Sequence, residues 1–418
     1  SYAGGAVKGY EDDVIIDLTD LMEENAPNYL AYIGQDQQNY RDAYNDAGQM
    51  LFMNGYNDYY VQARGNVIRQ DLLDKLGLDI PVTYDDYHDV LEAFKNDGIE
   101  YPIWMPQALQ GGALLSAGFG VSGYTLQQTG THFFQKDGTV YSSFLTEEYR
   151  EFLKIMAQWY SDGLIYHDFP FYGEQLAFRD MDKIGSGAVA CFYSETGDMA
   201  SFKDFSGDEN FLLTAMAPVS KEDGGTIYMS DKKPSRADDV RWAVTTGCED
   251  PELLISFVDY LYSDEGALLC NYGIEGETFE YDADGVPHFS DLIYNNPTYD
   301  YRTAVFLYVM DSGPTVVDPM RGTGTYTQEQ LDSWDQWQDA NLDYSHVIPN
   351  KVVLEAENAE YNNVKSDIDT FLDEMTVKYI TGEYSFDNYE TDFVEALKGM
   401  NADRLVELYQ DAYDNYAA

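Results

Sequence analysis

The 418-residue sequence contains few cysteines, little positive charge and no long apolar run. Cys191, Cys248 and Cys270 form an odd and widely spaced set, which excludes a disulfide framework as the basis of the fold. Apolar stretches such as Ala304–Met310 are too short to cross a bilayer. The 24 Lys and Arg residues are outnumbered by 75 Asp and Glu residues, giving a net charge of −51. Nucleic-acid binding needs a basic face, and anionic membrane surfaces repel acidic proteins, so we expect neither as a partner.

Common motifs of catalysis and metal binding are also missing. The sequence has no phosphate-binding loop, no dinucleotide-binding glycine motif and no complete nucleophile elbow. Its five His residues include no i,i+4 pair. Asp282–Gly285 resembles a calcium loop only superficially, because an Asp-Gly hairpin turn explains it better. We therefore expect no catalytic residue, no cofactor and no bound metal.

One enzymatic alternative stays open at this point. A glycosidase needs only two carboxylates about 5–10 Å apart. With 75 acidic residues such a pair arises by chance, so acid pairs neither support nor reject a carbohydrate-active hydrolase.

Aromatic residues are abundant: the chain has 37 Tyr, 21 Phe and 5 Trp. Tyr joins an apolar ring to a hydroxyl group, and sugars present the complementary pattern of apolar C–H faces and hydroxyl rims. The cluster of Tyr56, Tyr59 and Tyr60 therefore fits a sugar-binding cleft. The alternative is packing in a core or on a partner surface.

Local signals predict alternating strands and helices. Thr83 caps a helix over 84–96, Thr146 caps one that ends at Gly163, and Asp250 with Pro251 starts a third. The predicted strands are Gly65–Arg69, Tyr101–Met105, Ala188–Tyr193 and Trp242–Thr246, with a hairpin over Tyr281–Phe289. This alternation indicates an α/β fold with parallel sheets, in which ligands bind at the carboxyl ends of strands. The chain length favours two domains.

Several segments carry a family resemblance in a consistent order along nearly the whole chain. They include VIIDLTD (14–20), IRQDLLDKLGL (68–78), PVTYDD (81–86), WYSDGLI (159–165), CEDPE (248–252), FVDYLYSDEG (257–266), NYGIEG (271–276), YITG (379–382) and YQDAYD (409–414). Together they resemble the extracellular solute-binding lipoproteins of carbohydrate ABC importers, which are distant relatives of maltose-binding protein.

The resemblance implies a two-lobed, type II periplasmic-binding-protein-like α/β fold with a hinge and an interlobe ligand cleft. Lobe one is expected at residues 1–106 and 245–345, and lobe two at 107–244 and 346–418. Two features depart from the family. The usual first strand–helix–strand unit and lipid-modified Cys do not precede Ser1, so the chain is expected to start inside lobe one. The segment Asn96–Glu100 is also too short for the calcium-type loop of many relatives.

The resemblance also implies a set of cleft residues. It assigns stacking to Tyr2, Trp104, Tyr193 and Trp242, hydrogen bonding of sugar hydroxyls to Gln107 and Glu195, and a rim to Tyr56 and Tyr59. For each aromatic residue the alternative is core packing. Helical periodicity assigns Trp159 to the core, and Trp334 and Trp337 to one face of a helix.

The implied function is the capture of an oligosaccharide for an ABC-transporter permease by a non-catalytic monomer. The protein is then expected to be extracellular, held by a lipid anchor at the outer face of the cell membrane. The alternatives are the carbohydrate-active hydrolase and a peptide- or polyamine-binding protein on the same scaffold. The acidic charge permits a cationic ligand, whereas the Tyr content favours a sugar.

Overall fold

The computed structural model divides the chain into two compact units. The first unit comprises residues 1–61 and 234–326, and the second comprises residues 62–233 and 327–418. The structure describes residues 5–45, 47–57, 64–104, 115–121, 133–169, 180–228, 237–299, 301–310, 313–318, 321, 323–324, 326–339, 342–348 and 359–417. Within these ranges, no helix combines the length and the apolar character that a membrane span requires.

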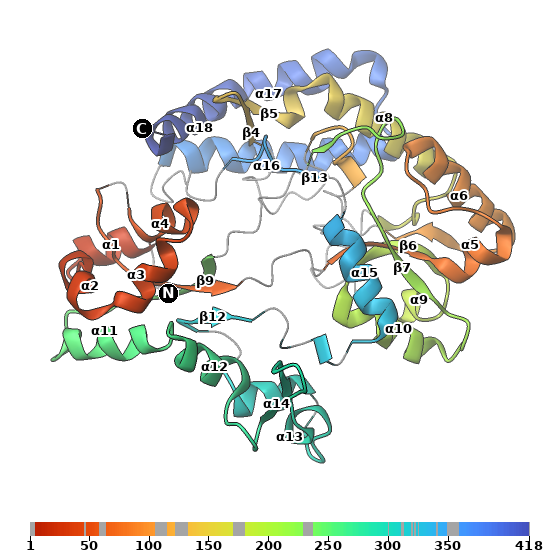
Figure 1. Ribbon diagram of the computed structural model, residues 1–418. Helices are drawn as coiled ribbons and strands as arrows, with labels where there is room; N and C mark the ends of the chain where they lie inside the picture. The colour runs from red at the N-terminus through yellow and green to blue at the C-terminus, as the bar shows by residue number, and fades with distance from the viewer. Residues whose placement is uncertain are drawn as a thin grey trace. The chain divides into compact units, whose positions relative to one another are not determined.

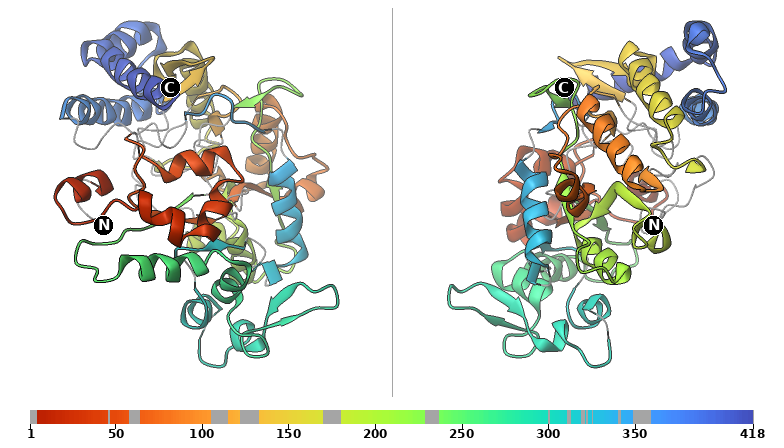
Figure 2. Two further views of the ribbon diagram at one scale, coloured as in Figure 1. Left: turned by 60° about the vertical axis from the view of Figure 1, so that its left-hand side comes forward. Right: turned by 90° about the vertical axis from the view of Figure 1, so that its right-hand side faces the viewer.

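The first unit contains a three-stranded sheet in the order β12-β1-β9, in which β12 is parallel and β9 antiparallel to β1. A separate hairpin, β10–β11, packs against α12 and α13 and is drawn in teal in Figure 2. The strands are β1 Met53–Asn57, β9 Ala237–Trp242, β10 Phe279–Tyr281, β11 Pro287–Phe289 and β12 Val316–Val317. The helices are α1 Gly5–Glu11, α2 Thr19–Asn25, α3 Pro27–Ile33, α4 Gln37–Ala43, α11 Pro251–Tyr260, α12 Asp264–Tyr272, α13 Asp291–Tyr294 and α14 Tyr301–Tyr308.

A buried carboxylate joins α11 to α3 in this unit. The Asp259 carboxylate, which is 4% exposed, accepts hydrogen bonds from the backbone N–H of Tyr29 at 2.8 Å and from the Asn28 side chain at 2.8 Å. The first N–H groups of a helix have no partner within the helix, and a negative charge is favourable there. Asp259 therefore supplies the missing acceptor for α3 and fixes it against α11.

The second unit contains a four-stranded sheet in the order β3-β6-β2-β7 and two small strand pairs, β4–β5 and β8–β13. Helices α16 and α18 pack together, and α16 also packs on α8 (Figure 1). The strands are β2 Arg64–Arg69, β3 Tyr101–Ile103, β4 Phe133–Lys136, β5 Thr139–Ser142, β6 Val189–Glu195, β7 Leu213–Met216, β8 Ile227–Tyr228 and β13 Leu342–Asp343. The helices are α5 Gln70–Leu76, α6 Tyr84–Asp97, α8 Glu147–Ser161, α9 Met181–Ile184, α10 Met199–Ser206, α15 Gln328–Asp339, α16 Ala359–Ile380, α17 Glu395–Gly399 and α18 Ala402–Ala417. A 3-10 turn, Thr196–Asp198, follows β6, and a 3-10 turn, Phe386–Asn388, and a π-helical segment, Glu390–Val394, precede α17.

Helix ends in this unit follow the predicted caps. The Thr83 hydroxyl accepts a hydrogen bond from the Asp86 N–H, and the Asp86 carboxylate accepts one from the Thr83 N–H, which forms a capping box at the start of α6. Gly98 ends α6 with φ 106°, in the left-handed region that glycine adopts without strain. At the start of α8, the Thr146 hydroxyl accepts a hydrogen bond from the Tyr149 N–H.

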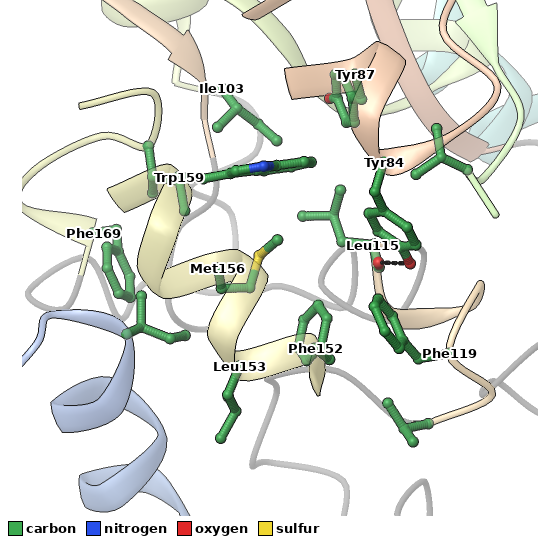
Figure 3. Packing of buried hydrophobic residues seen from close by; sticks show 14 of the residues in the cluster. Tyr84, Tyr87, Ile103, Leu115, Phe119, Phe152, Leu153, Met156, Trp159 and Phe169 are labelled. Carbon is green, nitrogen blue, oxygen red and sulfur yellow. Dashed lines mark hydrogen bonds between the residues drawn. The ribbon is translucent and has the colours of Figure 1, made fainter. Parts of the chain in front are cut away.

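The core of the second unit is rich in aromatic rings (Figure 3). Trp159, on the inner face of α8, is 2% exposed and meets the Tyr87 ring of α6 edge-on at 5.2 Å. Met156 and Phe152 extend the same face toward Tyr84 and Phe119 in Figure 3. The prediction that Trp159 belongs to the core is confirmed, and α8 is held by burial of one apolar stripe.

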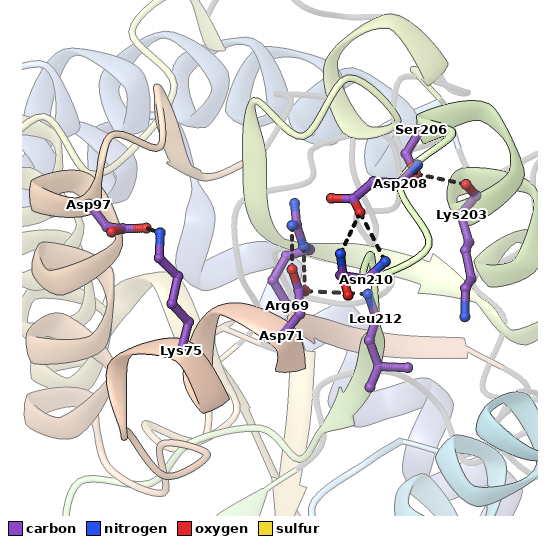
Figure 4. Close-up of polar contacts among 9 residues, drawn as sticks. All are labelled: Arg69, Asp71, Lys75, Asp97, Lys203, Ser206, Asp208, Asn210 and Leu212. Atoms are coloured by element: carbon purple, nitrogen blue, oxygen red, sulfur yellow. Dashed lines mark hydrogen bonds and ion pairs between the residues drawn. The ribbon is translucent and has the colours of Figure 1, made fainter.

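A polar brace holds the end of β2 (Figure 4). The Arg69 guanidinium donates from Nε and Nη2 to the two Asp71 oxygens at 2.7 and 2.6 Å and lies over the Phe211 ring at 4.3 Å. Asp71 also accepts from the Leu212 N–H at 3.3 Å. Leu212 directly precedes β7, so this brace ties the end of β2 to the start of β7.

The three thiols are free. Cys191 and Cys270 are buried and Cys248 is half-buried. Burial raises the pKa of the Cys191 thiol to about 12, and a contact with the Tyr87 side chain only partly opposes this effect. The prediction that Cys191 behaves as a small buried hydrophobe is confirmed.

Two sequence-based expectations about strands are wrong. The sheets are mixed rather than parallel, because β2 runs antiparallel to both β6 and β7. The strand expected at Trp242–Thr246 lies earlier: β9 ends at Trp242, where it pairs with Met53, and Thr245 forms only an isolated bridge with Ile15. The hairpin around Asp284-Gly285 is confirmed by the β10–β11 pair.

The boundaries of the units also differ from the expected lobes. The lobe boundaries were expected after residues 106, 244 and 345, whereas the two units meet after residues 61, 233 and 326. The reason is strand pairing and helix packing. β2 and β3 pair with β6 and join the second unit, β9 pairs with β1 and joins the first, and α15 packs on β7 and joins the second.

Two carboxylates of α16 lie one helical turn apart against α8. Asp369 pairs with Lys365 at 2.6 Å. Burial raises the Asp373 pKa to about 6, and the neighbouring Asp369 charge adds to this effect. The folded state therefore holds a proton on Asp373 that the unfolded chain loses near its ordinary pKa of 3.8.

This difference predicts a pH-dependent stability. The contribution of Asp373 is fully present below about pH 4 and is lost as the pH rises through about 6, because the charged form is then buried beside Asp369. We expect Asp373→Asn to raise the melting temperature above that of the wild type at pH 7 and to match it at pH 4. Melting curves from pH 4 to 7 test this, with exposed Asp367→Asn as the control. A constant difference between Asp373→Asn and wild type across that range would contradict the assignment.

Candidate functional site

The carboxyl ends of three strands meet at one edge of the second unit's sheet. β3 is parallel to β6, and β7 has the same direction because both β6 and β7 are antiparallel to β2. Tyr193, Ser194 and Glu195 end β6 at this edge, opposite Asn66, Gly65 and Arg64 of β2. Ligands of α/β sheets bind at such edges. We call the group Asn66, Tyr193, Ser194, Glu195 and Met216 the β6 edge.

A small apolar cluster lies over Tyr193. It contains Ala117, and Ile227, Leu342 and Tyr344 pack against it while staying partly exposed. Ile227 and Leu342 are register partners in the parallel pair β8–β13. Because each of these strands has only two residues, the pair is a small and easily displaced element beside the β6 edge.

Three half-buried rings, those of Tyr228, His346 and Tyr141, contact one another next to the β8–β13 pair. The His346 and Tyr228 rings stack at 4.5 Å with an interplanar angle of 2°, and the Tyr141 ring meets His346 edge-on at 6.4 Å. The Tyr141 hydroxyl lies 3.4 Å from Nδ1 of His346. Burial raises the Tyr141 pKa to about 12, and the nearby Glu148 charge adds to this, so its hydroxyl keeps its proton. Apolar ring faces and neutral hydroxyls thus occur together in this part of the unit.

Helix α15 fixes the opposite face of the same sheet. Trp337 Nε1 donates to the Asn66 carbonyl at 3.1 Å, and the Gln330 side chain donates to the Thr196 carbonyl at 2.5 Å. Gly65 permits this contact, since a Cβ there would lie 2.5 Å from Trp337 Nε1. The predicted helix-face role of Trp337 is confirmed, as is that of Trp334, which is 9% exposed on the same helix. The backbone of the β6 edge is therefore held in place by α15.

Two of the predicted cleft aromatics lie in cores. Tyr56 is 0% exposed and packs among Tyr29 and Tyr32 in the first unit. Trp104 is 2% exposed, with its ring 4.7 Å from that of Tyr166 in the second unit. A ring without exposed surface offers no face to a sugar, so the rim and stacking roles expected for these residues are replaced by the core-packing alternative.

Three other predicted residues lie at the ends of strands, and their binding roles stay predictions. Tyr193 and Glu195 lie together at the β6 edge, where Tyr193 is 8% exposed and Glu195 is half-buried. In the first unit, Trp242 is 38% exposed at the end of β9. The adjacent Arg241 guanidinium lies over the Phe52 ring at 4.8 Å. The remaining predicted residues, Tyr2, Tyr59 and Gln107, lie outside the described residues.

Sequence reasoning missed Asn66, Tyr228, Tyr344 and His346. Asn66 belongs to the β6 edge only through its strand register with Tyr193, a residue more than 120 positions away. Tyr344 and His346 follow β13 and reach this region through pairing with β8. Single Tyr and His residues at these positions do not specify which strands pair.

Metal-type ligands occur on α6. Side-chain atoms of His88, Asp89 and Glu92 lie within 4.8 Å of one another. The His88 Nε2 atom lies 3.1 Å from the Asp162 carboxylate, whose pKa is lowered by hydrogen bonds from Gln158 and then His88. Exposed groups of this kind are common without an ion. The absence of a bound metal stays a prediction.

The position of Trp104 generates a stability prediction. Truncation of a buried Trp removes transfer energy and leaves a cavity, so Trp104→Ala is expected to destabilise the second unit by about 3–5 kcal/mol. Trp242→Ala, at an exposed position, serves as the matched control with a change of less than about 1 kcal/mol. Urea unfolding followed by far-UV circular dichroism measures both. Equal unfolding midpoints for Trp104→Ala and wild type would show that this ring is not part of the core.

Comparisons with known proteins identify the relatives of the chain. It is 26% identical over 251 residues to lipoprotein LipO of Bacillus subtilis (strain 168), an alignment that covers 56% of this chain. The chain spans 47% of the length of LipO, about half. It is 19% identical over 368 residues to the polygalacturonan/rhamnogalacturonan-binding protein YtcQ of the same strain, covering 86% of this chain and 69% of YtcQ.

Solved structures show the same fold. The alginate-binding protein AlgQ2, without calcium, superposes with a TM-score of 0.70 at 20% identity, over 98% of this chain and 83% of that one. An extracellular solute-binding protein of Bifidobacterium longum subsp. infantis gives 0.74 at 16% identity, over 99% and 86%. FusA of S. pneumoniae in complex with kestose gives 0.72 at 17% identity, over 100% and 86%. The predicted type II periplasmic-binding-protein-like fold class is confirmed.

The family assignment follows from the sequence match. The pattern of the family described as bacterial extracellular solute-binding protein matches residues 3–268, more than half of the chain. This match confirms the resemblance found in the order of the short segments. The protein belongs to the family of bacterial extracellular solute-binding proteins.

Proposed function

We propose that the protein captures an oligosaccharide outside the cell and delivers it to the permease of an ABC importer, without catalysing a reaction. The observation that carries this proposal is the β6 edge. It lies at the carboxyl ends of β3, β6 and β7 and includes Tyr193 and the half-buried Glu195. A tyrosine hydroxyl and a carboxylate at such an edge fit a ligand with many hydroxyl groups.

The relatives support a carbohydrate ligand. YtcQ carries the name of a polygalacturonan/rhamnogalacturonan-binding protein, AlgQ2 that of an alginate-binding protein, and FusA was solved with kestose. These ligands differ in charge and linkage but are all chains of sugar units. We therefore propose an oligosaccharide as the ligand class.

Separate side chains take separate roles in this proposal. Glu195 accepts hydrogen bonds from sugar hydroxyls, which a carboxylate binds more strongly than a neutral acceptor does. Trp242, with 38% of its surface exposed, stacks on a sugar face. Tyr193, largely buried, supports the β6 edge and offers its hydroxyl rather than its ring face.

The family supports a proposal for cell location and partners. Membership in the extracellular solute-binding proteins and the lipoprotein designation of LipO support a protein outside the cell, held by a lipid anchor at the outer face of the cell membrane. The proposed partners are the oligosaccharide and the membrane permease, and the proposed state is a monomer. The net charge of −51 supports the proposal that nucleic acid is not a partner.

A thermal-shift screen tests the proposed function. The panel contains kestose, nystose, oligogalacturonides, alginate, cello-, xylo- and manno-oligosaccharides, together with amino acids, short peptides and polyamines. A ligand that binds only the native state raises the melting temperature, and we expect at least one oligosaccharide to do so. A shift given only by peptides or polyamines would reject the carbohydrate class. Release of reducing ends from a bound oligosaccharide would reject the non-catalytic assignment.

The role of Trp242 is tested by truncation. Loss of one aromatic stacking contact is expected to weaken binding by about 1–3 kcal/mol, by analogy with base–aromatic stacking. Calorimetry with the oligosaccharide that gives the largest thermal shift compares Trp242→Ala with wild type. Phe257→Ala is the matched control, since Phe257 is 60% exposed on α11 of the same unit. Unchanged affinity in Trp242→Ala, or an equal loss in Phe257→Ala, would remove Trp242 from the site.

A further inference from the structure

A buried amide lies in the middle of β2. Asn66 is 6% exposed, and among the residues that the structure describes its Nδ2 atom has no hydrogen-bond partner. The backbone of the same residue is well satisfied, because it pairs with Tyr193 and Met216, and its carbonyl accepts from Trp337 Nε1. The unsatisfied group is therefore the Nδ2 donor of the side chain.

Such a group is costly in the free protein. A buried donor without an acceptor destabilises a native structure by about 1–3 kcal/mol, and most buried polar atoms have a partner. A leucine has the same branching as an asparagine, and it would fill this position without the cost. The amide at position 66 therefore calls for an explanation other than stability.

Strand register shows where the amide lies. Side chains alternate between the two faces of a sheet. Gly65 lies against the Trp337 ring, on the face that α15 covers. Asn66 belongs to the other face, directly opposite Tyr193. Directly opposed residues have Cβ atoms about 5 Å apart. The Asn66 amide therefore lies next to Tyr193, two residues before Glu195 along β6.

We propose that the Asn66 carboxamide is a ligand-binding group, donating a hydrogen bond from Nδ2 to an oxygen of the bound oligosaccharide. This inference rests on the proposed function. The donor is covered in the free protein, and the ligand reaches it when the short β8–β13 pair over Tyr193 shifts. Because a site with a buried polar group discriminates strongly against ligands that leave it unpaired, Asn66 selects ligands with an acceptor oxygen at this position.

The proposal predicts opposite effects on stability and on binding. Asn66→Leu removes the unsatisfied donor, so the melting temperature of the free protein is expected to stay the same or rise. The same change is expected to weaken oligosaccharide binding by about tenfold, the upper part of the range for one hydrogen bond. Asn66→Ala, which cannot overpack the sheet, is expected to show the same loss of affinity.

The matched control is a buried polar residue of the same unit that has a partner. The Thr376 hydroxyl lies 2.9 Å from the Tyr149 hydroxyl and is 1% exposed on α16. Thr376→Val keeps the side-chain shape and leaves the Tyr149 hydroxyl unpaired. We expect it to lower the melting temperature and to leave the affinity unchanged, the reverse of Asn66→Leu.

The experiment measures melting temperatures of the free proteins and calorimetric affinities for the panel oligosaccharide with the largest shift. Full affinity in Asn66→Leu and Asn66→Ala would overturn this inference while the proposed function stands. A lower melting temperature in both variants with unchanged binding would show that Asn66 holds a structural water instead. If no oligosaccharide of the panel binds the wild type, the proposed function fails first, and this inference fails with it.

Discussion

The second unit depends on the position of β2, an antiparallel strand between two strands that share a direction. It is held at two points by different chemistry: Trp337 donates to the Asn66 carbonyl in the middle of the strand, and Arg69 with Asp71 ties its end to the start of β7. Because β2 reverses direction, the carboxyl ends of β3, β6 and β7 gather at a single edge. The candidate site is thus set by backbone pairing, and its side chains are placed by register.

Charge contributes less to this architecture than its excess suggests. Ion pairs such as Lys75–Asp97, with the Lys75 side chain 58% exposed, add little stability because water screens them. The carboxylates that shape the fold accept backbone N–H groups, as the buried Asp259 does for α3 and the half-buried Asp71 does for Leu212. Most of the remaining acidic surface keeps the protein hydrated, while the β6 edge relies mainly on neutral groups.

Sequence reasoning succeeded where the signal is local. Thr83, Thr146 and the Asp250-Pro251 pair mark helix starts that the structure reproduces, because a cap satisfies N–H groups within one turn. The hairpin at Asp284-Gly285 was also predictable, because an Asp-Gly pair is a local turn signal. Lobe boundaries were not, because they depend on which strands pair. Nothing near Gly65–Arg69 shows that this strand joins Val189–Glu195 rather than the first unit. Trp104 illustrates the limit for the site: the family resemblance assigned it to stacking, and only its burial and its packing against Tyr166 show its core role.

The three thiols have a practical consequence. Cys191 is buried with a pKa raised to about 12, and burial likewise raises the pKa of Cys270. Both therefore react slowly with alkylating reagents, since the thiolate is the nucleophile. Cys248, half-buried in the turn before α11, is the accessible thiol of the three. A maleimide dye added to the native protein would therefore label the first unit at one position without engineering the sequence.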